Sequence, residues 1–182
     1  MNKIFIFLTT GFEEIEAIGT IDILRRGGVN IQSVSLTGER TVTGKHNIAI
    51  VADCLFEEIS FADAQMLILP GGTVTINEHE ALKREVRTFA DHEKTLAAIC
   101  AAPMVLGRLG ILRGKKATCY AGFEKHLAGA IITDAPVVVD RNITTARAAA
   151  YTFDFALELL SQLKGKAAAE DVANKMKSIV AD

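Results

Sequence analysis

The chain contains 182 residues, of which 49% are hydrophobic and 23% are charged, with three cysteines and no tryptophan. A chain of this size can bury about 70% of its unfolded surface, so it needs no disulfide framework or structural metal in order to fold. Its hydrophobic content also excludes a disordered polypeptide. The 20 basic and 22 acidic side chains give a formal net charge of -2, which supplies no basic field to attract nucleic acid. The composition therefore predicts a globular protein that does not bind nucleic acid.

No segment of the sequence predicts contact with a membrane. The longest apolar stretch, residues 96–107, is interrupted by Pro103 and is shorter than the ~18 residues that a membrane span requires. The N-terminal segment has one positive charge, a short apolar run at residues 4–8 and no small-residue cleavage site, which argues against a signal peptide. We therefore expect a cytoplasmic protein.

In chain order, β-prone apolar runs alternate with segments of helical period, a pattern typical of parallel strands joined by helices. The first such unit is a buried strand at residues 4–8 followed by a helix over residues 13–27. The next predicted elements are a strand over 30–36, a hairpin or irregular edge over 41–51, a strand over 66–69, a helix over 78–92, a strand over 95–99, a helix over 101–109, and strands over 117–120, 137–140 and 143–146. Two further helices are predicted around Phe153, Leu157 and Leu160 and around Val172, Met176 and Ile179. We expect a flavodoxin-like α/β fold, a three-layer α/β/α sandwich with a mostly parallel sheet.

The segment Leu-Ala-Ala-Ile-Cys-Ala-Ala-Pro at residues 96–103 places Cys100 between a predicted strand and a predicted helix. The alanines two residues before and after Cys100 fit a nucleophile elbow, because this tight reversal accepts only small side chains. Pro103 suits the first turn of a helix, and the positive end of the helix dipole favours a thiolate. The alternative is a small core residue among alanines. Cys54 and Cys119 lack this frame and are interpreted as structural.

In open parallel sheets, ligands bind beyond the carboxyl ends of the strands. Gly71 and Gly72 follow the predicted strand at 66–69, so their backbone can approach a ligand closely and point N–H groups at it. Beside an elbow cysteine they would supply half of an oxyanion hole, and the N–H of Ala101 would supply the other half. The alternative is an ordinary turn at the end of a strand. No glycine-rich phosphate loop is present, so we expect no nucleotide cofactor.

The first predicted helix opens with glutamates at positions 13, 14 and 16. Acidic residues suit a helix N-terminus electrostatically, which accounts for Glu13 and Glu14. Glu16 shares a stripe with Thr20 and Ile23, so its carboxyl is expected to turn inward over the strand ends. There it would hydrogen-bond a thiolate or transfer protons during carbonyl chemistry. The alternative is a third acid that only serves the helix end.

The chain has four histidines, at positions 46, 79, 92 and 126, and none lies next to Cys100 in the sequence. No spacing of histidines or cysteines matches a metal site, so we expect no metal. A cysteine–histidine pair can nevertheless form in space. His126, downstream of the predicted elbow, is the candidate for such a pair, and a surface position is its alternative.

Three motifs together resemble the ThiJ/PfpI family, in its branch of the Parkinson-disease protein DJ-one and the bacterial YajL-type proteins. They are Gly-Phe-Glu-Glu-Ile-Glu at 11–16, Leu-Pro-Gly-Gly at 69–72 and Ala-Ala-Ile-Cys-Ala-Ala-Pro at 97–103. The similarity extends over essentially the whole chain, and the order of the three motifs makes it specific. The resemblance implies a single ThiJ/PfpI-type domain over residues 1–182, a flavodoxin-like fold, a homodimer and a reactive cysteine at the elbow.

Carried over by position, the resemblance implies that Cys100 is the oxidation-prone nucleophile and Glu16 its protonated partner. Gly72 and Ala101 match the backbone donors beside the nucleophile. No cofactor is implied.

The sequence also departs from the family pattern. Protease-like members have a histidine directly after the nucleophile, where this chain has Ala101, which counts against a peptidase. Tyr120 stands where the DJ-one branch often has a histidine, and tyrosine is a poor base near neutral pH. The turn at 147–151 lacks the Gly-Pro-Gly of that branch. We therefore expect the pocket wall at this turn to differ from that of the branch. The candidate pocket residues are Gly71, Tyr120 and Arg147.

The resemblance implies glyoxalase or deglycase activity on methylglyoxal or its adducts, or redox-sensing and chaperone roles. In the first hypothesis, the Cys100 thiolate adds to a small reactive aldehyde or glycated substrate, Glu16 moves the proton between carbons, and hydrolysis releases a hydroxy acid. In the second, Cys100 of a stress protein oxidises to a sulfinate. A third is an amidase or peptidase that uses His126 or a residue of a partner chain as base. All three require the same nucleophile, so the sequence leaves them open.

The implied homodimer has candidate contacts on the first predicted helix. These are the charged residues Asp22, Arg25 and Arg26.

Overall fold

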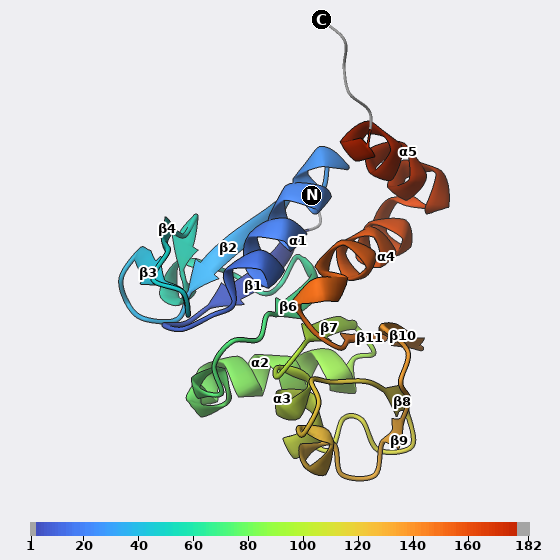
Figure 1. Cartoon of the computed structure of the whole chain (residues 1–182). Helices are drawn as coiled ribbons and strands as arrows, with labels where there is room; N and C mark the ends of the chain where they lie inside the picture. The colour runs from blue at the N-terminus through green and yellow to red at the C-terminus, as the bar shows by residue number, and fades with distance from the viewer. Residues whose placement is uncertain (1–2, 178–182) are drawn as a thin grey trace, which may run out of the picture.

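The computed structural model describes residues 3–177 and contains a central sheet of seven strands (Figure 1). These strands are β1 (Lys3–Leu8), β2 (Ile31–Ser35), β5 (Cys54–Leu55), β6 (Ala64–Leu69), β7 (Thr95–Ile99), β10 (Val137–Asp140) and β11 (Ile143–Ala146). Their order across the sheet is β10-β11-β7-β6-β1-β2-β5. The hairpin of β10 and β11 is antiparallel, and the other neighbours pair in parallel. The predicted mostly parallel sheet is confirmed.

Helices cover both faces of the sheet (Figure 1). The helices on one face are α1 (Glu14–Arg26), α4 (Thr152–Lys164) and α5 (Lys166–Lys177), and those on the other are α2 (Glu80–Asp91) and α3 (Pro103–Arg108). Alternation along β1 produces the two cores, because successive side chains of a strand point to opposite faces. Ile4, Ile6 and Leu8 pack with the first set of helices, and Phe5 and Phe7 pack with the second. The predicted three-layer α/β/α sandwich is confirmed.

Two small sheets lie outside the central one. The predicted hairpin over 41–51 forms β3 (Thr41–Thr43) and β4 (Ala49–Val51), which pair antiparallel. The predicted strand over 117–120 is wrong in extent: only β8 (Lys116–Ala117) is a strand, and it pairs with β9 (Ile131–Ile132). The backbone of Tyr120 turns aside because its N–H donates to the carbonyl of Cys100 over 2.7 Å.

The predicted helices form with shifted ends. The helix expected over 101–109 begins at Pro103, because the residues before it complete the turn after β7. The final helix carries Val172 and Met176 as expected, whereas Ile179 lies outside the described residues. Within residues 3–177, no helix combines the length and apolar character needed to cross a bilayer.

The sheet order brings three loops together at one edge. β1, β6 and β7 are neighbours, so the segments that follow them meet at their carboxyl ends, where open parallel sheets bind ligands. These segments begin the first helix, carry the glycine pair and contain Cys100.

Candidate active site

Cys100 occupies a strained turn between β7 and α3. Its φ of +65° lies in the left-handed region, which a non-glycine residue adopts only when its surroundings enforce it. Two hydrogen bonds do so: the N–H of Cys100 donates to Ala146 over 2.8 Å, and its carbonyl accepts from Tyr120 over 2.7 Å. The tight reversal expected of a nucleophile elbow is therefore present, and it presents the thiol at the sheet edge.

Glu16 lies in the first turn of α1 and is fully buried. Its Oε2 accepts a hydrogen bond of 2.7 Å from the N–H of Gly71, and its Oε1 is buried without a hydrogen-bond partner among the described residues. Thr20 and Ile23 are also fully buried, so the stripe faces the interior. Glu13 caps the helix through a 2.8 Å bond from the N–H of Glu16 to its Oε2, which fixes the start of the turn.

The glycine pair gives Glu16 and Cys100 room to meet. A Cβ on Gly71 would lie 2.8 Å from the Cβ of Cys100 and 2.9 Å from Oε2 of Glu16, closer than non-bonded atoms approach. Gly72 has a φ of +96°, and a Cβ there would collide with the backbone of residues 11–13. Only glycine lets the chain after β6 pass this close to both side chains.

The Cys100 thiol and the Glu16 carboxyl titrate as a coupled pair. Burial raises the pKa of Glu16 to about 7, against the lowering effect of the hydrogen bonds from Gly71 and Cys100. Burial and the nearby Glu16 carboxylate raise the pKa of Cys100 to about 12. Between about pH 7 and about pH 12 the pair therefore holds one proton and one negative charge.

The backbone donors beside Cys100 favour its thiolate but do not by themselves set the pKa of the thiol. The N–H groups of Ala101 and Gly72 donate to the sulfur and lower its pKa, but burial and Glu16 outweigh them. Both predicted backbone donors thus contact the sulfur of Cys100. Because the pKa of the thiol lies above that of the Glu16 carboxyl, the single proton of the pair is held by the sulfur.

A cleft of about 270 Å³ opens over the Cys100–Glu16 pair. Its walls come from the start of α1, the β3–β4 hairpin, the segment after β8 and the turn before α4. The lining residues are Glu13, Glu16, Lys45, His46, Gly72, Cys100, Ala101, Tyr120, Phe123, Ala148, Ala149 and Ala150.

The structure brings some of the candidate residues to this cleft and leaves others away from it. Tyr120 lines it, and Gly71 lies behind it against Cys100 and Glu16. Arg147 is not among the lining residues, because its guanidinium donates to the carbonyl of Asp134 over 3.1 Å. His126 is also absent from the lining and its ring packs beside Phe123.

The other two cysteines lie in the core, as expected. Cys54 and Cys119 are buried, and burial raises the pKa of each thiol.

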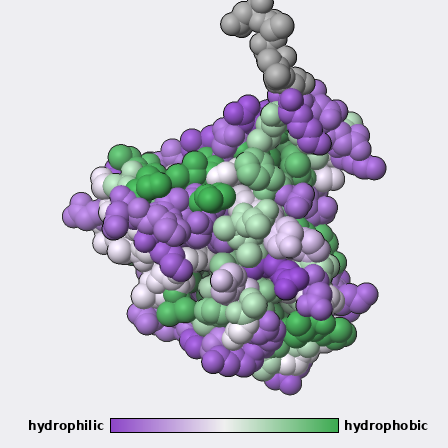
Figure 2. Space-filling model, in the orientation of Figure 1, coloured by the Kyte–Doolittle hydropathy of each residue, from purple (hydrophilic) through white to green (hydrophobic). Residues whose placement is uncertain are grey.

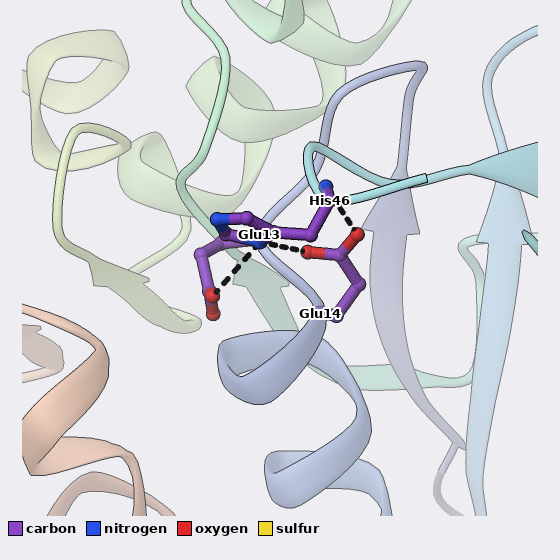
Figure 3. A group of neighbouring side chains, drawn as sticks. All are labelled: Glu13, Glu14 and His46. Carbon is purple, nitrogen blue, oxygen red and sulfur yellow. Dashed lines mark hydrogen bonds and ion pairs between the residues drawn. The ribbon is translucent and has the colours of Figure 1, made fainter. Parts of the chain in front are cut away.

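One group of side chains beside the cleft was not predicted from the sequence. Glu13 and Glu14 at the start of α1 lie next to His46 of the β3–β4 hairpin (Figure 3). Glu14 is 4% exposed and accepts two bonds from His46, 2.6 Å from the backbone N–H and 2.8 Å from Nδ1. Oε1 of Glu13 lies 3.9 Å from the same Nδ1. The sequence feature that points to this contact is Gly44 in the hairpin. A Cβ at this position would collide with the Glu14 carboxyl, so the close approach of the hairpin to Glu14 requires glycine.

One ligand atom from each of Glu13, Glu14 and His46 lies within 4.8 Å of the others, close enough for metal ligation. Both oxygens of Glu14 and one oxygen of Glu13 already accept hydrogen bonds. We therefore interpret the group as a hydrogen-bonded carboxylate–imidazole pair.

Known proteins resemble this chain along most of its length. The model of the DJ-1/PfpI family matches residues 2–162. Protein DJ-1 homolog B of Arabidopsis thaliana is 36% identical over 96% of this chain, which spans 41% of that protein. A protein of Pyrococcus horikoshii named a deglycase is 34% identical over 87% of this chain and 98% of its own. The chain thus spans less than half of the Arabidopsis relative and nearly all of the archaeal one.

Solved structures show the same fold. A mutant of a DJ-1 superfamily protein from Salmonella typhimurium superposes with a TM-score of 0.92 at 32% identity, covering 98% of this chain and 100% of that one. The structure described as oxidised DJ-1 of Toxoplasma gondii has a TM-score of 0.91 at 28% identity over 97% and 98% of the two chains. The fold, the motifs and the family match agree: this chain belongs to the DJ-1/PfpI family.

Proposed function

We propose that this chain is a cofactor-independent enzyme that acts on small reactive 2-oxoaldehydes such as methylglyoxal, or on the adducts that they form. The observation that carries the proposal is the coupled Cys100–Glu16 pair at the base of a cleft of about 270 Å³. A space of this size suits a substrate of a few heavy atoms. The deglycase name of the Pyrococcus horikoshii relative supports the same class of substrate.

The pair has the properties that the first step requires. Sγ of Cys100 attacks the aldehyde carbon while the thiol proton passes to the Glu16 carboxylate, so no free thiolate is needed beforehand. A carboxyl with a pKa of about 7 both accepts and returns a proton near neutral pH, which is the optimum for acid–base catalysis. Glu16 then moves a proton between the two carbons of the hemithioacetal, and the resulting thioester of a hydroxy acid is hydrolysed.

The test is lactate formation from methylglyoxal by the purified protein, with no added cofactor. Wild type and Cys54→Ala should both produce lactate, and Cys100→Ala should not. Cys54 is the matched control because it is a cysteine that does not line the cleft. Lactate formation that survives in Cys100→Ala would exclude this function.

A second candidate is a redox sensor, supported by the relative described as oxidised and by the partial exposure of Cys100 beside two buried cysteines. The N–H groups of Ala101 and Gly72 donate to the sulfur and would equally hold sulfinate oxygens. Mild peroxide followed by peptide mapping should oxidise Cys100 before Cys54 or Cys119. Oxidation of all three at equal rates would contradict this role. An amidase or peptidase lacks comparable support, since its candidate base His126 does not line the cleft.

We also propose that two copies of the chain pair through the outer face of α1 and the β3–β4 hairpin. Ile15 and Ile18 on α1 and Ile48 and Val51 on the hairpin are exposed, and Figure 2 shows apolar residues over this side of the molecule. An exposed apolar patch of this kind marks an interaction surface.

The charged candidates for the pairing, Asp22, Arg25 and Arg26, continue the exposed face of α1 toward its end. Within the chain, Arg26 pairs with Asp22 over 2.7 Å and Arg25 pairs with Asp53 over 2.6 Å. Exposed pairs of this kind contribute little to stability by themselves, so they are free to serve as the polar rim of an interface.

A further inference from the structure

The proposed reaction ends in a further proton transfer, for which the cleft offers a group other than Glu16. Hydrolysis of a thioester on Cys100 requires a water molecule to lose a proton as it attacks, on the open side of the cleft. Glu16 is fully buried and one of its oxygens is held by Gly71. Tyr120 also lines the cleft, and its phenol can donate a hydrogen bond.

His46 lines the same cleft as Cys100 and Tyr120. Its loop is docked on the segment that precedes α1 by two backbone bonds besides its own bond to Glu14: Gly11 N–H donates to Thr43 and Lys45 N–H donates to Phe12, each over 2.8 Å. The side chain of His46 is 63% exposed within one copy of the chain and lines the open cleft. The fixed loop therefore presents an imidazole to the cleft that contains Cys100.

Glu14 sets the orientation and tautomer of this imidazole. The carboxylate oxygen Oε2 can only accept, so the 2.8 Å contact with Nδ1 places the imidazole proton on Nδ1. Nε2 is left as an acceptor. Burial raises the pKa of Glu14, but hydrogen bonds from the His46 side chain and backbone lower it overall, so the carboxylate stays charged.

We propose that His46, positioned by Glu14, is the general base that activates water to hydrolyse the acyl group from Cys100; this rests on the proposed function. Nε2 takes a proton from water as the oxygen bonds to the thioester carbon. The tetrahedral intermediate collapses, the carbon–sulfur bond breaks, and the imidazolium proton returns to the sulfur. The sum is thioester plus water giving free thiol plus carboxylic acid, with no oxidant or metal.

Two other cleft residues are poorer candidates for this step. Lys45 is beside His46 in the loop and also lines the cleft, but an ammonium group has no lone pair to accept a proton. Oε2 of Glu13 accepts the capping hydrogen bond from the N–H of Glu16, and its Oε1 lies 3.9 Å from Nδ1 of His46. Its charge therefore assists Glu14 in holding the imidazole.

The test uses burst kinetics with p-nitrophenyl acetate, a probe that acylates thiols. The burst of p-nitrophenol reports acylation of Cys100, and the steady rate that follows reports hydrolysis of the acyl group. We expect His46→Gln to keep the burst and to lower the steady rate about 100-fold, within the range of general-base contributions. Glu14→Gln should lower the steady rate less, and added imidazole should partly restore it in His46→Ala. His92→Gln is the matched control, because His92 is exposed directly after α2 and lies outside the cleft lining.

Each outcome separates this proposal from the proposed function. A steady rate in His46→Gln equal to that of wild type overturns the role of His46, as does a steady rate that a chelator abolishes in wild type. Loss of the burst in His46→Gln would show that the histidine acts on the thiol instead. A wild type that shows the burst and the histidine dependence but makes no lactate from methylglyoxal would contradict only the proposed substrate. A wild type without a burst would overturn both.

Discussion

The backbone N–H of Gly71 donates to Oε2 of Glu16 over 2.7 Å, and the same glycine leaves space for Cys100 on its other side. This contact ties the loop after β6 to the first turn of α1 and holds the carboxyl beside the thiol. Because the carboxyl is buried, its pKa is raised to about 7. Several measurable properties depend on that one buried acid.

The reactivity of Cys100 should rise with pH through a midpoint near 7. Below this pH both groups of the pair are protonated and no base is present to take the thiol proton. Above it the Glu16 carboxylate accepts that proton, since its pKa is about 7. The rate of alkylation by iodoacetamide, followed by intact mass, should show this midpoint in wild type and lose it in Glu16→Gln. A midpoint that is the same in both proteins would show that another group controls the thiol.

Glu16→Gln should stabilise the protein at alkaline pH. The pKa of Glu16 rises from an ordinary value of 4.5 to about 7 on folding, so the folded state binds more protons between these values. The stabilising effect of this acid is fully present below 4.5 and is lost as the pH rises through 7. The glutamine carbonyl still accepts from Gly71 and carries no charge.

We expect the free energy of unfolding of wild type to fall, relative to that of Glu16→Gln, by roughly 2–3 kcal/mol between pH 5 and pH 8. Urea denaturation at the two pH values measures this difference. An equal difference between the two proteins at both pH values would mean that Glu16 ionises with an ordinary pKa.

Gly71→Ala should impair the site through steric contact. The added methyl would lie 2.8 Å from the Cβ of Cys100 and 2.9 Å from Oε2 of Glu16, so one of the two side chains must move. We expect a loss of about 1–3 kcal/mol in stability, typical of overpacking, and at least a tenfold loss of lactate formation. Gly38→Ala is the control: its φ of +80° adds strain but nothing lies within 4 Å, so activity should persist. Equal activity losses in both variants would argue against a steric cause.

Ile18→Glu should separate the proposed homodimer. A charge in the middle of the exposed apolar face of α1 would be buried at the interface without a partner, which costs several kcal/mol. Sedimentation velocity should then show a monomer for this variant and a dimer for wild type. Ile132→Glu places the same charge on a similarly exposed isoleucine of β9 and should leave the dimer intact. A monomeric wild type, or a dimer in Ile18→Glu, would contradict the proposed interface.

Much of the fold followed from local patterns in the sequence. The uninterrupted apolar run of β1 required burial on both faces, because alternate residues such as Ile4 and Phe5 enter different cores. The alanines around Cys100 and the glycines after β6 predicted their turns, since steric limits on a tight turn depend only on nearby residues. The inward direction of Glu16 also followed from its helical stripe. The length of strand β8 was overestimated. The N–H of Tyr120 donates a hydrogen bond to the distant Cys100 carbonyl, and this contact turns the chain away from the strand.

Tertiary structure alone decided the relationships between distant segments. His46 lies 32 positions from Glu14 in the sequence, and their 2.8 Å contact exists only because the hairpin folds onto the start of α1. Arg147, a predicted pocket residue, lies outside the cleft lining because its guanidinium meets a carbonyl elsewhere. The protonation of the Cys100–Glu16 pair was equally beyond local pattern, since it depends on burial and on the distance between two charges. The sequence by itself therefore determined the sheet, the elbow and the nucleophile candidate, and the packed structure decided which charged and polar groups surround that thiol.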